Sequence, residues 1–134
     1  MKLPDQVKAD QVVAGDLEAI CQDLNDEFGA MAGRCLMIAG GAGFLGYYLV
    51  QSALHWNRTR AGAAPIHVTV LDSFIRGMPA WLTALGEDRN LTLIRHDVTV
   101  ALPPEIGHQD YLIHAASIAS PIYYRKYPIE TMDA

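Results

Sequence analysis

The sequence lacks any apolar run of the roughly 20 residues that a helix needs to cross a membrane. Its first ten residues also lack the apolar core of a secretory signal. Cysteine is scarce, and Cys21 and Cys35 do not have the spacing of a metal or redox site. Reduced thiols are the default in a cytoplasm. We therefore expect a soluble, cytoplasmic chain that has no membrane partner.

An excess of positive charge is also missing, since the formal net charge is −5. The negative charge lies in residues 1–32, whereas acidic and basic residues balance in residues 33–134. A basic face for nucleic acid is therefore not expected. The 134 residues are 51% hydrophobic and 19% charged, which is typical of a globular domain. We expect an acidic N-terminal segment, residues 1–32, followed by one domain over residues 33–134.

The N-terminal segment changes character near Asp16. Residues 1–14 are polar and weakly patterned, so we expect a loose arm there. After Asp16, apolar residues recur at the spacing of one helical face, which predicts an amphipathic helix. The stripe consists of Leu17, Ile20, Cys21, Leu24 and Phe28. We expect this helix to pack on the domain's own surface, with a subunit or partner contact as the alternative.

The rest of the chain alternates between strand-like and helix-like segments. Short apolar runs predict strands over residues 35–39, 66–71, 91–94 and 111–114. Helical stretches are expected over residues 44–57 and 79–85 and from Pro121 onward. Such alternation predicts an α/β fold with a parallel sheet and helices on both faces.

A glycine-rich turn follows the first predicted strand and opens a helix. Gly40, Gly43 and Gly46 have the spacing G-x-x-G-x-x-G. The first glycine would allow a tight turn, the second would let a pyrophosphate approach the backbone, and the third would let the helix pack closely on the sheet. The amides and dipole of the helix then face the phosphates. This context predicts nucleotide binding.

Asp72 ends the second predicted strand, where a carboxylate can accept both hydroxyls of a ribose. A carboxylate here would repel a 2′-phosphate, which favours NAD over NADP. Arg76, four residues later, keeps NADP open as an alternative. Asp72 could instead simply begin a turn before Ser73.

Taken in order, these residues resemble the extended short-chain dehydrogenases, namely the NAD-dependent epimerase/dehydratase family that acts on nucleotide sugars. The resemblance covers about residues 35–134 and implies the N-terminal part of a Rossmann-like domain with strand order 3-2-1-4. It implies adenine binding by Asp97 and the Val98 amide, and close approach of the cofactor to the segment after the fourth strand. The implied cofactor-binding residues are Gly40, Gly43, Phe44, Leu45, Gly46, Asp72, Asp97, Val98, Ala115, Ala116 and Ser117.

Within this family, the segment from Ala116 to Tyr124 is similar to UDP-glucuronate decarboxylases. Ser120, Tyr123 and Tyr124 either line a sugar pocket or pack at the start of a helix. The resemblance implies NAD as the cofactor and a nucleotide sugar as the substrate of the full-length parent.

The family's chemistry needs a Tyr and a Lys four residues later on one helix face. None of the six Tyr residues has a Lys at that distance, and no metal-ligand cluster is evident. We therefore expect the NAD-binding portion of an enzyme, without catalytic residues and with an exposed fourth strand that favours self-association. The alternatives are a stand-alone, non-catalytic nucleotide-binding module and an NADP-dependent reductase of the same fold.

Overall fold

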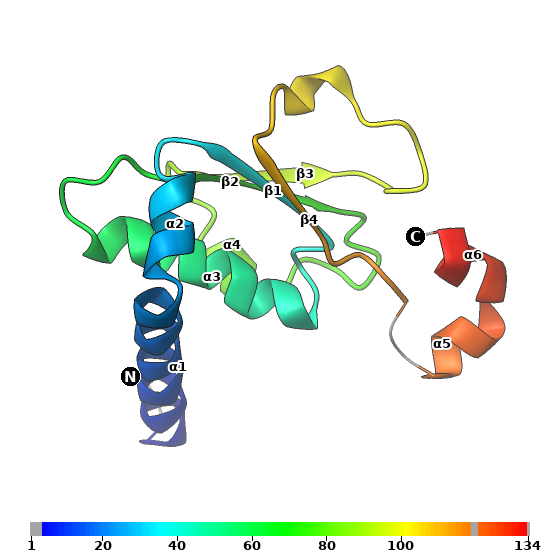
Figure 1. Ribbon diagram of the computed structural model, residues 1–134. Helices are drawn as coiled ribbons and strands as arrows, with labels where there is room; N and C mark the ends of the chain where they lie inside the picture. The colour runs from blue at the N-terminus through cyan, green and yellow to red at the C-terminus, as the bar shows by residue number, and fades with distance from the viewer. Residues whose placement is uncertain (1–3, 119–120, 134) are drawn as a thin grey trace.

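The computed structural model describes residues 4–118 and 121–133, and its centre is a four-stranded parallel sheet (Figure 1). The strand order is β3-β2-β1-β4, which confirms the predicted order. The strands are β1 (Cys35–Ala39), β2 (His67–Asp72), β3 (Leu91–Arg95) and β4 (Tyr111–His114). In this order β1 pairs with β2 on one side and with β4 on the other, so the glycine turn leaves the sheet between two neighbouring strands.

Helices connect the strands in the way that the sequence predicts. A long helix, α3, joins β1 to β2, and the short helix α4 lies between β2 and β3. In the described part of the chain, the β3–β4 connection contains only the 3-10 helix η1. The bounds are α3 (Phe44–Thr59), α4 (Ala80–Ala84), η1 (Pro104–Ile106), α5 (Pro121–Lys126) and α6 (Pro128–Asp133).

The core lies mainly on the sheet face that α3 and α4 cover (Figure 1). Alternate side chains of a strand point to the same face. Ile38 of β1 and Val70 of β2 are therefore buried side by side, with Leu54 of α3 and Leu82 of α4 also fully buried in this region. Burying side chains of this size contributes about 1.5–3 kcal/mol each. The sheet thus holds the carboxyl ends of its strands in fixed positions.

The expected loose arm is wrong for the described residues, because α1 (Pro4–Asp23) begins at Pro4. Proline is favoured in the first turn of a helix, and no glycine or further proline interrupts residues 5–14. The predicted amphipathic helix is also divided, because α1 ends before Leu24 and α2 (Asn25–Met31) follows. None of the helices in the described ranges is both long and apolar enough to cross a membrane.

The second half of α1 packs on the domain's own surface against α3. Leu17 and Cys21 are buried, and burial raises the pKa of the Cys21 thiol. Glu18 lies 3.0 Å from the His55 ring, and this hydrogen bond lowers the pKa of Glu18. Leu24 was expected on the buried stripe but is 43% exposed, because it lies at the bend between α1 and α2.

Candidate functional site

The glycine turn begins at Gly40, whose conformation and surroundings both require glycine. Its φ of +77° lies in the left-handed region, which confirms the predicted tight turn. A Cβ atom on Gly40 would lie 2.5 Å from the Cα of Ala116, in the segment that follows β4. Two implied cofactor-binding residues are therefore in close contact. Ala115 extends this contact by donating its N–H to the carbonyl oxygen of Ala39.

Gly46 and Gly41 are required for packing within the turn itself. A Cβ atom on Gly46 would overlap the backbone of Gly41. The close approach of the helix that Gly46 allows is therefore to the turn that follows β1. The sequence analysis missed Gly41, where a Cβ atom would lie 2.8 Å from the Val70 side chain. Two consecutive glycines after a buried strand were the available signal.

Gly43 is different, because it is exposed and a Cβ atom there would meet fewer atoms than one on Gly40, Gly41 or Gly46. Only the carbonyl oxygen of Gly40 lies near its missing Cβ, at 3.3 Å. Phe44 and Leu45 begin α3 with side chains that are 90% and 64% exposed. The first N–H groups of a helix have no partner within the helix, and the dipole makes that end positive. The surface at Gly43–Leu45 can therefore accept an anion such as a phosphate.

Asp72 connects the end of β2 to the glycine turn. Its Oδ2 accepts a hydrogen bond of 3.0 Å from the N–H of Ala42, and its Oδ1 accepts one of 2.9 Å from the N–H of Phe74. Each carboxylate oxygen can accept more than one hydrogen bond. Asp72 can therefore hold the turn and also accept a ligand hydroxyl. The bond to Phe74 confirms the alternative prediction that Asp72 begins a turn, whereas sequence reasoning missed the bond to Ala42. The ribose-binding role of Asp72 stays a prediction.

The loop after β2 is fixed by a buried anchor that the sequence did not reveal. Phe74 is 5% exposed and has a φ of +51°, which is unusual for a residue other than glycine. The guanidinium of Arg95 lies over its ring, with Cζ 5.3 Å from the centroid, and donates a hydrogen bond of 3.1 Å to the Ser73 carbonyl oxygen. These contacts hold the loop in one position.

Asp97 and Val98 lie farther along the same edge, after β3. Asp97 Oδ1 accepts hydrogen bonds from the hydroxyl and the N–H of Thr99, which lower the pKa of its carboxyl group, the hydroxyl most. Because β2 separates β3 from β1, the structure does not bring Asp97 to the glycine turn. Ser117 is exposed, and Ser120 lies outside the described residues.

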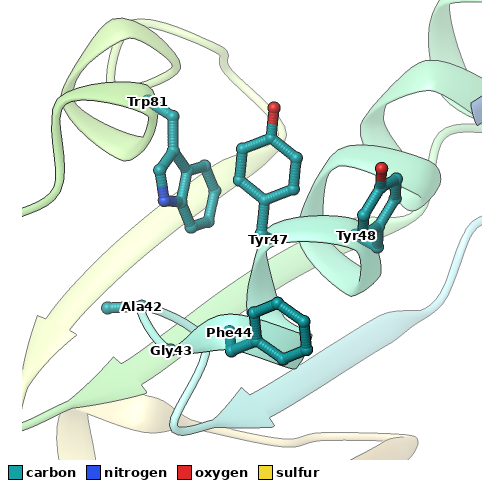
Figure 2. Close-up of a pocket in the computed structure, with 6 residues that line it drawn as sticks. All are labelled: Ala42, Gly43, Phe44, Tyr47, Tyr48 and Trp81. Atoms are coloured by element: carbon teal, nitrogen blue, oxygen red, sulfur yellow. The ribbon is translucent and has the colours of Figure 1, made fainter. Parts of the chain in front are cut away.

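An open depression of about 440 Å³ adjoins the turn and is shown in Figure 2. Tyr47 stands between two other rings, with its centroid 5.2 Å from those of Tyr48 and Trp81. The Tyr48 hydroxyl donates a 2.8 Å hydrogen bond to Asp16, which raises the pKa of Tyr48. The depression is lined by Ala42, Gly43, Phe44, Tyr47, Tyr48 and Trp81. The described residues contain no cluster suited to a metal ion.

Curated proteins with similar sequences are UDP-glucuronic acid decarboxylases. The chain is 34% identical over 97 residues to UDP-glucuronic acid decarboxylase 3 of Arabidopsis thaliana, a match that covers 72% of this chain and 25% of the relative. It is also 34% identical over 97 residues to UDP-glucuronic acid decarboxylase 1 of Danio rerio, covering 72% of this chain and 21% of the relative. The matches thus span about a quarter or less of the relatives' length. No protein-family model matches the chain.

Solved structures with a similar fold include an epimerase from Methanothermobacter thermautotrophicus. The TM-score is 0.59 at 22% identity, and the match covers 80% of this chain and 30% of the epimerase. UDP-N-acetylglucosamine 4-epimerase from Methanobrevibacter ruminantium, solved with UDP-N-acetylmuramic acid, gives a TM-score of 0.57 at 25% identity and covers 75% and 30% of the two chains. An enzyme of Bordetella bronchiseptica solved with NAD+ gives 0.57 at 20% identity, covering 78% and 29%. The chain is therefore a homologue of the UDP-glucuronic acid decarboxylases and, with them, of the NAD-dependent epimerase/dehydratase family of extended short-chain dehydrogenases.

Proposed function

We propose that this chain is the NAD-binding portion of a nucleotide-sugar epimerase, dehydratase or decarboxylase. The observation that carries the proposal is the exposed backbone at Gly43, directly before a helix of 16 residues. A pyrophosphate there would accept hydrogen bonds from the free N–H groups of Phe44 and Leu45. The relatives' names and the NAD+ complex of one structural neighbour support the same assignment.

The remaining assignments follow the carboxyl-terminal edge of the sheet. Asp72 would accept hydrogen bonds from the ribose hydroxyls while it holds the Ala42 N–H, which favours NAD over NADP. Asp97 and the Val98 amide would hold the adenine. The small residues Ala115 and Ala116, with Ser117 after them, would let the cofactor pass along the backbone after β4.

When bound, NAD would supply reversible hydride transfer for the chemistry of the nucleotide sugar. No residue of the chain is assigned to proton transfer, because none of its tyrosines has a lysine four positions later. We therefore expect no turnover of a nucleotide sugar by the purified 134-residue chain. Measured turnover would contradict the assignment of the chain to the cofactor-binding portion alone.

Titration calorimetry with NAD tests the binding directly. We expect binding by the wild type and none by Gly43→Val, whose side chain would stand where the pyrophosphate must approach. Gly29→Ala is the matched control, because it lies within α2 and its Cβ atom would have open space. Urea unfolding should show that both variants fold. Retained NAD binding by Gly43→Val would mean that the turn serves only the packing of the chain.

We also propose that the chain self-associates through β4. In the described sheet β4 pairs only with β1, so its other edge has unpaired backbone groups, and Leu112 is 59% exposed. Such an edge is a template for pairing with another chain. Light scattering at tens of micromolar should therefore detect a species larger than the monomer, and a clean monomer would overturn this proposal.

A further inference from the structure

A cation–π contact joins the loop after β2 to the helix that follows β4. The Cζ atom of Arg76, in the loop after β2, lies 5.5 Å from the ring centroid of Tyr123 in α5. The helix α5 follows β4, and the strands β2 and β4 are the two neighbours of β1. The contact therefore joins the segments that follow the two neighbours of β1, the strand whose own end carries the glycine turn. Figure 1 shows the end of β4 and α5 on the side of the sheet toward which the strands run.

The loop that carries Arg76 is anchored by backbone hydrogen bonds and by the buried Phe74 ring. Asp72 accepts the N–H of Phe74, and the N–H of Gly77 donates a 2.8 Å hydrogen bond to the carbonyl oxygen of Phe74. Gly77 adopts a φ of +84°, which closes this tight turn. The guanidinium of Arg95 covers the Phe74 ring. The backbone of Arg76 is thus part of an anchored turn, and its side chain has the Tyr123 ring as a contact.

We propose that Arg76 binds a phosphate of the dinucleotide and that Tyr123 is a positioning residue that holds Arg76 across the glycine turn. This proposal rests on the proposed function. A guanidinium offers five donors in a planar fork that matches phosphate oxygens. An aromatic ring on one side attracts the cation without consuming those donors. The helix N-terminus would bind the phosphates from one side, and Arg76 would bind them from the other.

The same charge bears on the choice between NAD and NADP. Asp72 and Arg76 have opposite charges and flank the same loop, so only Asp72 would disfavour a 2′-phosphate. Tyr123 belongs to the helix after β4, so its contact would hold Arg76 toward that helix, and the arginine would serve the phosphates that both cofactors share. Arg76→Met should therefore weaken NAD and NADP by similar factors, rather than selectively weakening NADP.

Calorimetry with NAD at two salt concentrations tests this pair. Arg76→Met should weaken NAD about ten-fold or more, since it removes charge-assisted hydrogen bonds, and it should reduce the salt dependence of binding. Tyr123→Leu should weaken NAD about two- to five-fold, whereas Tyr123→Phe keeps the ring and should bind like the wild type. The double variant, Arg76→Met with Tyr123→Leu, should be no weaker than Arg76→Met alone, because Tyr123 acts through Arg76.

The outcomes separate this proposal from the proposed function. A wild-type chain that does not bind NAD would overturn the proposed function, and the role of Arg76 with it. Binding by the wild type with unchanged affinity in Arg76→Met would overturn the role of Arg76 alone. Losses that add in the double variant, or a Tyr123→Phe variant as weak as Tyr123→Leu, would overturn the positioning role of Tyr123. Equal thermal midpoints across the variants should show that the fold is unchanged.

Discussion

The two ends of the sheet use the same kind of hydrogen bond for different purposes. At the amino-terminal end, Asp110 accepts the N–H of Cys35 at 2.8 Å. The amide of Asn57 bonds both the N–H and the carbonyl oxygen of Ile66, at 2.7 and 2.8 Å. At the carboxyl-terminal end, Asp72 similarly accepts the N–H of Ala42. In each case a polar side chain satisfies backbone groups that the strands leave unpaired.

What differs is the space around these bonds. At the amino-terminal end the Asp110 carboxylate is engaged by other side chains, since it also lies 3.1 Å from His108 and 3.8 Å from Arg34. At the carboxyl-terminal end the hydrogen bond of Asp72 organises a turn that stays open at Gly43. The two ends therefore differ in the glycines beside the polar side chain, more than in the type of polar residue, and this difference marks the carboxyl-terminal end as the candidate ligand site.

The largest effect is expected inside the turn, at Gly46→Ala. The new methyl group would overlap the Gly41 backbone, which cannot yield as a flexible side chain can. We expect the free energy of unfolding to fall by about 3 kcal/mol or more. Urea denaturation measures it. Gly43→Ala is the matched variant and should lose much less stability, because its methyl group meets only one atom at 3.3 Å. If Gly46→Ala and Gly43→Ala lose the same free energy of unfolding, the structural difference between these two glycines does not hold.

A smaller effect is expected at the amino-terminal end, from Asn57→Ala. Its removal leaves both backbone groups of the buried Ile66 without these partners. We expect the free energy of unfolding to fall by about 1–3 kcal/mol, while the dissociation constant for NAD stays unchanged. Asn57→Asp can still accept the N–H of Ile66, but its second oxygen would face the Ile66 carbonyl oxygen, so this variant should also lose stability. If the Asn57→Ala variant is fully folded but binds NAD more weakly than the wild type, the two ends of the sheet are not independent.

The smallest effect concerns the pH dependence of stability. The N–H of Cys35, followed by His108, lowers the pKa of Asp110 below its ordinary value of 3.8. A carboxyl group with a lowered pKa contributes stability that is present above the unfolded-state pKa and is lost as the pH falls through the folded-state pKa. Unfolding curves should therefore show stability declining below about pH 4, with a shallower decline in Asp110→Asn. If stability declines as steeply with falling pH in Asp110→Asn as in the wild type, Asp110 does not contribute to this pH dependence.

Sequence reasoning reached the parts of the fold that depend on local patterns. The strands over residues 35–39 and 111–114 have the predicted bounds, and the glycine spacing located the turn. The bond from Asp72 to Ala42 joins residues 30 positions apart, and the overlap of Gly46 with Gly41 depends on the path of the turn. Such contacts leave no periodic signal in a sequence. For the same reason the sequence analysis did not find the Arg76–Tyr123 pair.

The central claim is that the open carboxyl-terminal end of the sheet binds NAD and the closed amino-terminal end does not. An NMR titration of the 134-residue chain with NAD, following each backbone amide, tests this claim most directly. The account predicts large, saturable shifts at Gly43, Phe44 and Leu45, and little change at Cys35 and Ile66. Shifts of equal size at both ends, or no shifts at the glycine turn at saturating NAD, would contradict it.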